Sequence, residues 1–256
     1  MIQSVDRAIR VLTALQGARR MSLSELAARL ELAPSTTHGI VRTLVEHGMV
    51  VQERGSSRYQ LGPAVLRLGN VYLDTLDLRT RVNTWAEALA EQAGLSVRTG
   101  VLLLTDVIVV HHVPRPDNSL QMPEVGIVIP AHASALGKAL IAFDEVAAAQ
   151  VLDGEAARRS MTGETITDPD SLRRQVAEIR ASGVATEIEE AVLGECGAAA
   201  PLFDASGVTV GAIGLVAQAG EWPLPSTSID ALKSAARAIS REMGASRWPP
   251  PLVDQT

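Results

Sequence analysis

Five residues that follow Pro34 within two helical turns carry groups that bind nucleic acid: Ser35, Thr36, Thr37, His38 and Arg42. Hydroxyl groups and the amide groups at a helix start suit phosphate oxygens, while an imidazole or a guanidinium can reach base edges in a major groove. Ile40, Val41 and Leu44 form a separate apolar face. We predict a DNA-reading helix over residues 34–48. The alternatives are an ordinary solvated helix face and a surface for protein contacts.

Two arginines flank the next polar segment. Residues 49–53 and 58–61 have the pattern of two short strands, and residues 54–57 between them include no apolar side chain. Arg54 and Arg58 stand on either side of the tip, where they would contact the phosphate backbone. We predict a β-hairpin wing that binds DNA.

The second half of the chain contains few residues of the kinds used by enzymes. Cys196 and His132 could serve a hydrolase, but the neighbouring Glu195 disfavours a thiolate at Cys196. His111 and His112 are adjacent on a predicted strand, so they point to opposite faces and cannot both bind one metal ion. We predict no enzyme activity, no metal and no cofactor; a hydrolase that uses Cys196 and His132 is the distant alternative.

Two further helices must position the DNA-reading helix. The first runs from Ser4 and stops at Gly17, and the second begins at Ser22, where Glu25 completes a capping box. A three-residue turn then leads to Pro34, a residue that suits the first position of a helix. Two short helices joined in this way form a helix-turn-helix.

The length of 256 residues predicts two domains, each with its own core. We predict a winged helix-turn-helix at 1–62, a linker helix at 63–79, an α/β domain at 80–246 and a flexible tail at 247–256. The fold class is therefore α+β. Apolar residues cover more of the linker helix than one domain contact requires, which predicts that it dimerises.

The second domain alternates between helical and strand patterns. We predict helices at 80–93, 133–142, 170–181 and 228–243. We predict strands at 96–104, 107–113, 199–203 and 208–217.

Composition and charge narrow the class of protein. Apolar residues make up 46% and charged residues 20%, which excludes a wholly disordered chain. Residues 1–81 carry 11 Arg against seven acids, whereas residues 82–256 carry 12 Lys and Arg against 22 acids. The basic first part suits nucleic acid, although a solvated charge imbalance would look the same. One cysteine, no membrane span and no signal peptide predict a cytoplasmic protein.

Several separated motifs resemble the IclR family of transcriptional regulators. The motifs lie at residues 22–27, 34–38, 42–44, 58–62, 132–140, 165–170, 190–194 and 199–201. Within the family, residues 38–40, 72–74, 111–117 and 124–126 are most similar to actinobacterial glycerol operon regulators. The resemblance implies a GAF-like effector-binding second domain, a homodimer or homotetramer, a double-stranded DNA operator and a role as a repressor of a catabolic operon.

The resemblance also implies where the effector binds. Carried over by position, the effector-binding residues are His132, Ala133, Ser134, Ala135, Glu187, Cys196, Gly197 and Gly214. The amide groups at the start of the predicted helix 133–142 would favour an anionic group. Glycerol 3-phosphate is the effector that the family suggests. Gly197, Gly214 and Val216, where relatives carry polar residues, instead suggest an aromatic or aliphatic carboxylate, unless the two glycines serve tight strand packing.

Overall fold

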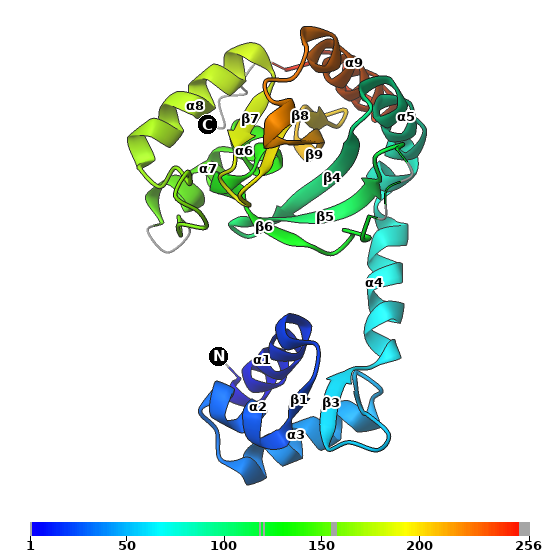
Figure 1. Cartoon of the computed structure of the whole chain (residues 1–256), viewed down its shortest axis with the longest axis vertical. Coiled ribbons are helices and arrows are strands. Elements are labelled where there is room, and N and C mark those ends of the chain that lie inside the picture. Colours follow the sequence, from blue (N-terminus) through cyan, green and yellow to red (C-terminus); the bar gives the residue numbers. More distant parts are fainter. Residues whose placement is uncertain (1, 118, 120, 155–157, 251–256) are drawn as a thin grey trace. The chain divides into compact units, whose positions relative to one another are not determined.

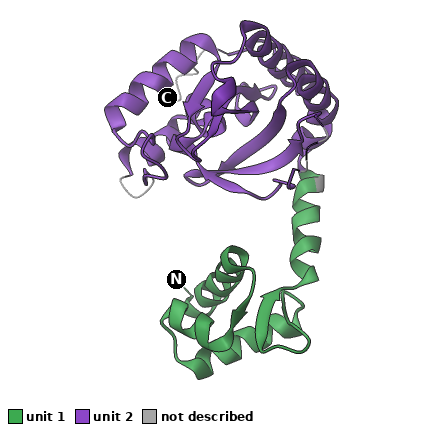
Figure 2. Cartoon of the chain, viewed as in Figure 1, with its two compact units in different colours: residues 1–75 green, residues 76–256 purple. Residues whose placement is uncertain are grey.

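The computed structural model describes residues 2–117, 119, 121–154 and 158–250. The chain forms two compact units, Met1–Thr75 and Leu76–Thr256, which Figure 2 shows in different colours. Each unit has its own hydrophobic core.

The first unit combines four helices with a three-stranded sheet among the described residues (Figure 1). The helices are α1 (Gln3–Ala18), α2 (Leu23–Leu30), α3 (Pro34–Glu46) and α4 (Pro63–Thr75). The strands are β1 (Met21–Ser22), β2 (Val50–Gln52) and β3 (Arg58–Leu61), in the order β1-β3-β2. The predicted helix-turn-helix and wing are confirmed.

Local sequence signals account for the ends of these helices. The Ser22 hydroxyl accepts a hydrogen bond from the Glu25 amide, and the Glu25 carboxylate accepts one from the Ser22 amide. Pro34 opens α3 at a position that needs no amide donor. Strand β1 was not predicted, because its two residues are too few to show an alternating pattern.

The second unit is built on one antiparallel sheet with the order β6-β5-β4-β9-β8-β7. The strands are β4 (Ser96–Leu103), β5 (Asp106–Val113), β6 (Val128–Pro130), β7 (Ala185–Ile188), β8 (Glu195–Phe203) and β9 (Thr209–Gln218). Figure 1 shows the sheet curled, with helices on both faces.

Helices of the second unit form two layers. The helices are α5 (Asp77–Ala93), α6 (Ala135–Ile141), α7 (Glu145–Asp153), α8 (Pro169–Ser182) and α9 (Ser226–Glu242), with short 3-10 turns at η1 (Ala131–Ala133) and η3 (Ala219–Glu221). Helices α5 and α9 pack together on one face of the sheet, and α6 packs on the other with α7 and α8 outside it.

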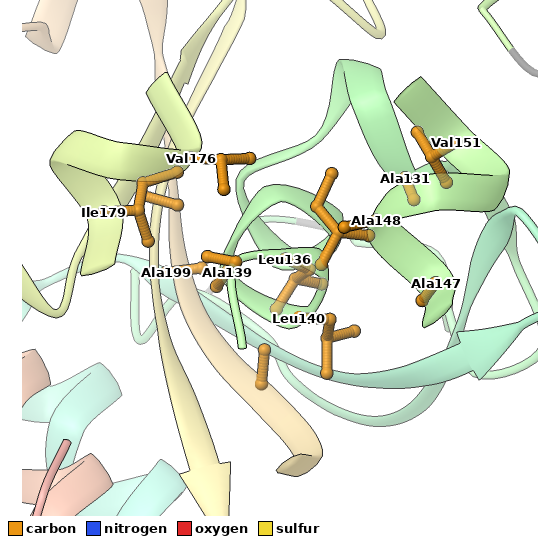
Figure 3. Packing of buried hydrophobic residues seen from close by; sticks show 14 of the residues in the cluster. Ala131, Leu136, Ala139, Leu140, Ala147, Ala148, Val151, Val176, Ile179 and Ala199 are labelled. Carbon is orange, nitrogen blue, oxygen red and sulfur yellow. The ribbon is translucent and has the colours of Figure 1, made fainter. Parts of the chain in front are cut away.

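Small side chains let α6 approach the sheet closely. Figure 3 shows Leu136, Ala139 and Leu140 of α6 within the core that α7, α8 and Ala199 of β8 complete. A Cβ on Gly137 would lie only 2.2 Å from the backbone of Ala131, so this position has no room for a side chain.

Several elements of the second unit differ from the prediction. Strands β6 and β7 and helix α7 were not predicted, and β8 begins at Glu195 rather than at residue 199. Strands β6 and β7 are short, and the alanine and glycine residues of β8 give no alternation of apolar and polar side chains. The predicted helix 133–142 is divided at Ser134, which has an extended backbone between η1 and α6.

The tail that we predicted to be loose from residue 247 is held at Trp248. Its Nε1 donates a hydrogen bond to the Pro201 carbonyl at 2.8 Å, and the Arg237 guanidinium lies 5.2 Å from the centre of its ring. An aromatic ring with one polar group can bury its apolar surface and still satisfy its donor. Residues 251–256 of the predicted tail lie outside the described residues.

No helix in the described part of the chain is long and apolar enough to cross a membrane.

The contact at Gly137 gives a stability prediction. Gly137→Ala should lower the free energy of unfolding of the second unit by about 3 kcal/mol, because the added methyl group must push η1 away from α6. Gly17→Ala is the matched control, since a Cβ at this helical position meets nothing within 4 Å. Thermal and urea unfolding measure both variants. Equal stability of Gly137→Ala and the wild type would contradict the proposed packing constraint.

Candidate functional site

The outward face of α3 carries most of the predicted DNA-binding residues. Ser35, His38 and Arg42 are exposed, and Thr36 is half-buried. The Arg42 guanidinium pairs with Glu46 one turn later, at 3.0 Å and in solvent, so this weak pair can open when a phosphate or a base approaches. Thr37 differs from the prediction: it is fully buried, and its hydroxyl donates to the Ala33 carbonyl. Thr37 therefore supports the start of α3 instead of its outward face.

The wing carries the other two predicted residues. Arg54 is exposed at the tip, and Arg58 is exposed at the start of β3. The Arg58 guanidinium lies 3.3 Å from the Glu25 carboxylate, which connects the wing to α2. Hydrogen bonds from Ser22, aided by Arg58, lower the pKa of Glu25. The wing and the helix-turn-helix thus share one polar surface.

In the second unit, a narrow cavity of about 30 Å³ lies between α6 and the sheet. Its lining includes five of the predicted effector-binding residues: Ser134, Ala135, Glu187, Gly197 and Gly214. Strand pairing brings three of these together from distant parts of the sequence. Glu187 pairs with Gly197 across β7 and β8, and Gly214 pairs with Ala199 across β9 and β8.

The two glycines of the cavity differ in how tightly they are packed. A Cβ at Gly214 would lie 3.0 Å from both the Ala198 carbonyl oxygen and the Ala199 Cβ, so strand packing alone accounts for this glycine. A Cβ at Gly197 would lie 3.3 Å from a Glu187 carboxyl oxygen, 3.4 Å from the Ala135 Cβ and 3.5 Å from the Leu215 carbonyl oxygen. Gly197 is therefore also closely packed, although less tightly than Gly214.

Glu187 is the most perturbed acid of this cavity. Burial raises the pKa of its carboxyl to about 7, although a hydrogen bond from the Glu190 amide at 3.1 Å acts in the opposite direction. Glu190 itself pairs with the buried Lys138 ammonium at 2.5 Å. The carboxyl of Glu187 is therefore close to half-protonated at neutral pH and can donate as well as accept hydrogen bonds.

The helix start that we predicted to bind an anion is partly occupied. The Ser134 hydroxyl accepts the amide hydrogen of Gly137 at 3.1 Å, and the Ser134 carbonyl accepts that of Lys138. These donors already have partners within the chain, which weakens the case for an anion held by the helix alone.

His132, Ala133 and Cys196 do not line the cavity as the structure describes it. Ala133 is buried in η1, and the His132 Nε2 atom lies 3.0 Å from the Arg159 carbonyl. Cys196 precedes Gly197 on β8, so its side chain points to the other face of the sheet. Burial raises the pKa of the Cys196 thiol, which opposes the thiolate that a hydrolase would need.

The adjacent histidines point to opposite faces, as predicted. The His111 Nε2 atom lies 3.1 Å from the Asn83 amide oxygen of α5, whereas the His112 Nε2 atom lies 3.5 Å from the Glu124 carboxylate.

Sequence reasoning missed Arg98, which lies on β4 at the boundary between the narrow cavity and a larger one of about 310 Å³. Its guanidinium bonds to both Glu124 and Glu195. Burial lowers the pKa of Arg98, but the hydrogen bonds and charges of the two carboxylates outweigh this effect and raise it. The one charged residue of β4 was the available signal, but its partners are 26 and 97 residues away.

Two family models match the chain. The model described as IclR helix-turn-helix domain matches residues 4–54, and the model described as bacterial transcriptional regulator IclR C-terminal matches residues 70–241. The chain belongs to the IclR family. As a member of this family it is a DNA-binding transcriptional regulator, and the resemblance seen in its sequence is confirmed.

Relatives and solved structures cover almost the whole IclR-family chain. The glycerol operon regulatory protein of Streptomyces coelicolor is 43% identical over 96% of this chain and 98% of its own length. That of Streptomyces griseus is 42% identical over the same shares. The crystal structure of an IclR transcriptional regulator from Alicyclobacillus acidocaldarius is 26% identical, covers 95% of this chain and 100% of its own, and has a TM-score of 0.80.

Glu187 gives this regulator a testable pH dependence. Its pKa is higher in the folded chain than the ordinary value of 4.5, so folding favours the protonated form, and stability falls as pH rises from about 4.5 through about 7. Glu187→Gln should remove this loss, so that the variant gains roughly 2–4 kcal/mol over the wild type between pH 4 and pH 8.

Urea unfolding across this pH range measures the effect. Glu178→Gln, at an exposed position of α8, is the matched control and should follow the wild type. Parallel stability curves for Glu187→Gln and the wild type would show that Glu187 titrates normally.

Proposed function

We propose that this regulator represses a catabolic operon and is controlled by a small anionic metabolite. One observation supports the proposal most directly: the chain joins an exposed, polar α3 to a separate unit with a cavity between α6 and the sheet. Similarity to two glycerol operon regulatory proteins over nearly the full chain suggests glycerol catabolism as the process.

The DNA-binding residues of the proposal are Ser35, Thr36, His38 and Arg42 of α3, together with Arg54 and Arg58 of the wing. Helix α3 would enter the major groove, with His38 and Arg42 toward base edges. The arginines of the wing would contact phosphates beside it.

For the effector we propose glycerol 3-phosphate, or another small hydroxylated anion of similar size. It would contact Ser134, Ala135, Glu187 and Gly197. The alternative of a bulkier aromatic or aliphatic carboxylate depends on space at Gly197 and Gly214. Tight packing at Gly214 favours the smaller ligand.

The proposed assembly is a homodimer, or a homotetramer made of dimers, that joins through α4. Leu68, Val71 and Tyr72 lie on one side of this helix with 48–59% of their surface exposed in the single chain. A row of large apolar side chains in solvent suits a second copy of the same helix. Two-fold symmetry would also match paired operator half-sites.

Three arginine variants test the DNA-binding surface. Arg42→Ala should weaken specific operator binding about tenfold, because a base or phosphate contact is lost in each half-site. Arg54→Ala and Arg58→Ala should weaken binding to all DNA sequences and reduce its dependence on salt.

Fluorescence anisotropy with DNA from upstream of the regulator's own gene, and with unrelated DNA, measures these effects. Arg173→Ala, on the exposed side of α8, removes the same charge from the other unit and serves as control. Unchanged affinity in all three variants would refute the assignment of α3 and the wing.

A charge on α4 tests the assembly. Val71→Asp should split the dimer, since the carboxylate would be buried between apolar side chains without a partner. Leu66→Asp is the control, because Leu66 is 66% exposed and lies on the opposite side of α4. Sedimentation velocity at micromolar concentration gives the outcome. A monomeric wild type, or a dimeric Val71→Asp variant, would place the contact elsewhere.

A further inference from the structure

The narrow cavity has one positively charged side chain in its described lining. That residue is Arg98, which shares the lining with two acids, Glu187 and its ion-pair partner Glu195. Lys138 lies close to the same layer, but its ammonium is buried against Glu190 and is absent from the lining that the structure describes. An anion that enters this cavity therefore has Arg98 as its nearest available cation.

Arg98 also borders the larger, polar cavity. Glu195 and Val216 are shared by the two linings, and Arg115, Glu124 and Gln121 belong only to the larger one. Arg98, together with Glu195 and Val216, thus borders both spaces. A ligand that extends from one cavity into the other must pass these residues.

The guanidinium is almost fully occupied by two carboxylates. Its Nε and one terminal nitrogen donate to Glu124, the latter at 2.9 Å, and both terminal nitrogens donate to Glu195, at 2.5 and 3.2 Å. The Arg98 side chain is only 12% exposed, while those of Glu124 and Glu195 are 20% and 22% exposed. The carboxylates can therefore rotate toward solvent more easily than the arginine can.

Three observations define one site: a mostly buried guanidinium that borders two cavities, its saturation by two acids, and the partial exposure of those acids. We propose that Arg98 binds the anionic group of the effector, and that Glu124 and Glu195 hold its place when the effector is absent. This inference rests on the proposed function, in which the effector is an anion. The group recognised is an oxyanion, either a phosphate or a carboxylate.

Charge balance allows the anionic group of the effector to replace one carboxylate on Arg98. An anion alone would add a negative charge beside two carboxylates, which is unfavourable. An anion that replaces one carboxylate on Arg98 leaves the charge near the guanidinium nearly unchanged, and the released carboxylate regains water. A planar guanidinium can bind a phosphate or a carboxylate through two parallel hydrogen bonds, as it now binds Glu124.

A second group that could bind an oxyanion, the His112 side chain, lies beside the Glu124 carboxylate. His112 pairs with Arg98 across β5 and β4, and its side chain is only 5% exposed. Its Nε2 atom faces Glu124 at 3.5 Å and has no hydrogen-bond partner within the described structure. An oxyanion in the position of the Glu124 carboxylate would come within reach of this nitrogen.

Isothermal titration calorimetry on the full-length protein tests the exchange. The probes are glycerol 3-phosphate, benzoate and glycerol, which separate a phosphate, a carboxylate and an uncharged polyol. Arg98→Gln should raise the dissociation constant of the bound anion at least about tenfold. Glu195→Gln and Glu124→Gln should lower it by about threefold or more, since the amides compete less well for the guanidinium.

Arg173→Gln is the control for the loss of one positive charge, and it should bind like the wild type. Arg98→Lys keeps the charge but lacks the paired donors, so it should retain part of the affinity. It replaces Arg98→Gln in the test if that variant fails to fold. The two glutamate variants keep Arg98 and test the exchange independently.

The outcomes separate the two proposals. A wild type that binds neither anion overturns the anionic effector and, with it, the role of Arg98. A wild type that binds an anion, with the same affinity in Arg98→Gln, overturns the role of Arg98 alone. Weaker anion binding in both glutamate variants would make these acids part of the binding site and would refute the exchange, as would equal binding of glycerol and glycerol 3-phosphate.

Discussion

The close approach of α6 to the sheet is the constraint on which the second unit depends. The alanines of β8 and Gly214 of β9 allow it from the side of the sheet. Gly137 lets α6 also pack against η1, because any side chain there would collide with the backbone of Ala131. The same closeness leaves only a narrow cavity and excludes water from Glu187 and Lys138, which explains why both have shifted pKa values. The packing of small residues thus leads, through burial, to the shifted pKa values of Glu187 and Lys138.

The charged groups around this core are paired in different ways. Lys138 and Glu190 are both almost fully buried, and separating them would leave a charge without compensation. Arg98 and its two acids all retain some contact with solvent, with 12%, 20% and 22% of their side chains exposed, so these pairs can be exchanged at a lower cost. One ion pair therefore stabilises the layer between α6 and β7, and the other lies where a ligand can compete. The burial of the acidic partners, more than the number of ion pairs, therefore distinguishes the structural Lys138–Glu190 pair from the exchangeable pairs of Arg98.

The sequence predicted the elements whose signals are local. The capping box at Ser22, Pro34 at the start of α3, and the polar tip between β2 and β3 each lie within a few residues, so the DNA-binding unit was predicted nearly complete. The site in the second unit depends on pairing between distant strands. Neither the partners of Arg98 nor the close packing at Gly197 and Gly214 has a local signal, because the neighbours involved come from distant parts of the chain, including β7, β8 and α6.

Helix α5 connects the strands of the site to α4 along the chain. Helix α4 ends at Thr75, Leu76 has an extended backbone, and α5 begins at Asp77. Helix α5 packs on β4, the strand that carries Arg98, and its Leu78 fills the space that Gly211 of β9 leaves open. The first turn of α5 is therefore packed against the sheet of the site, and along the chain only Leu76 separates this turn from α4.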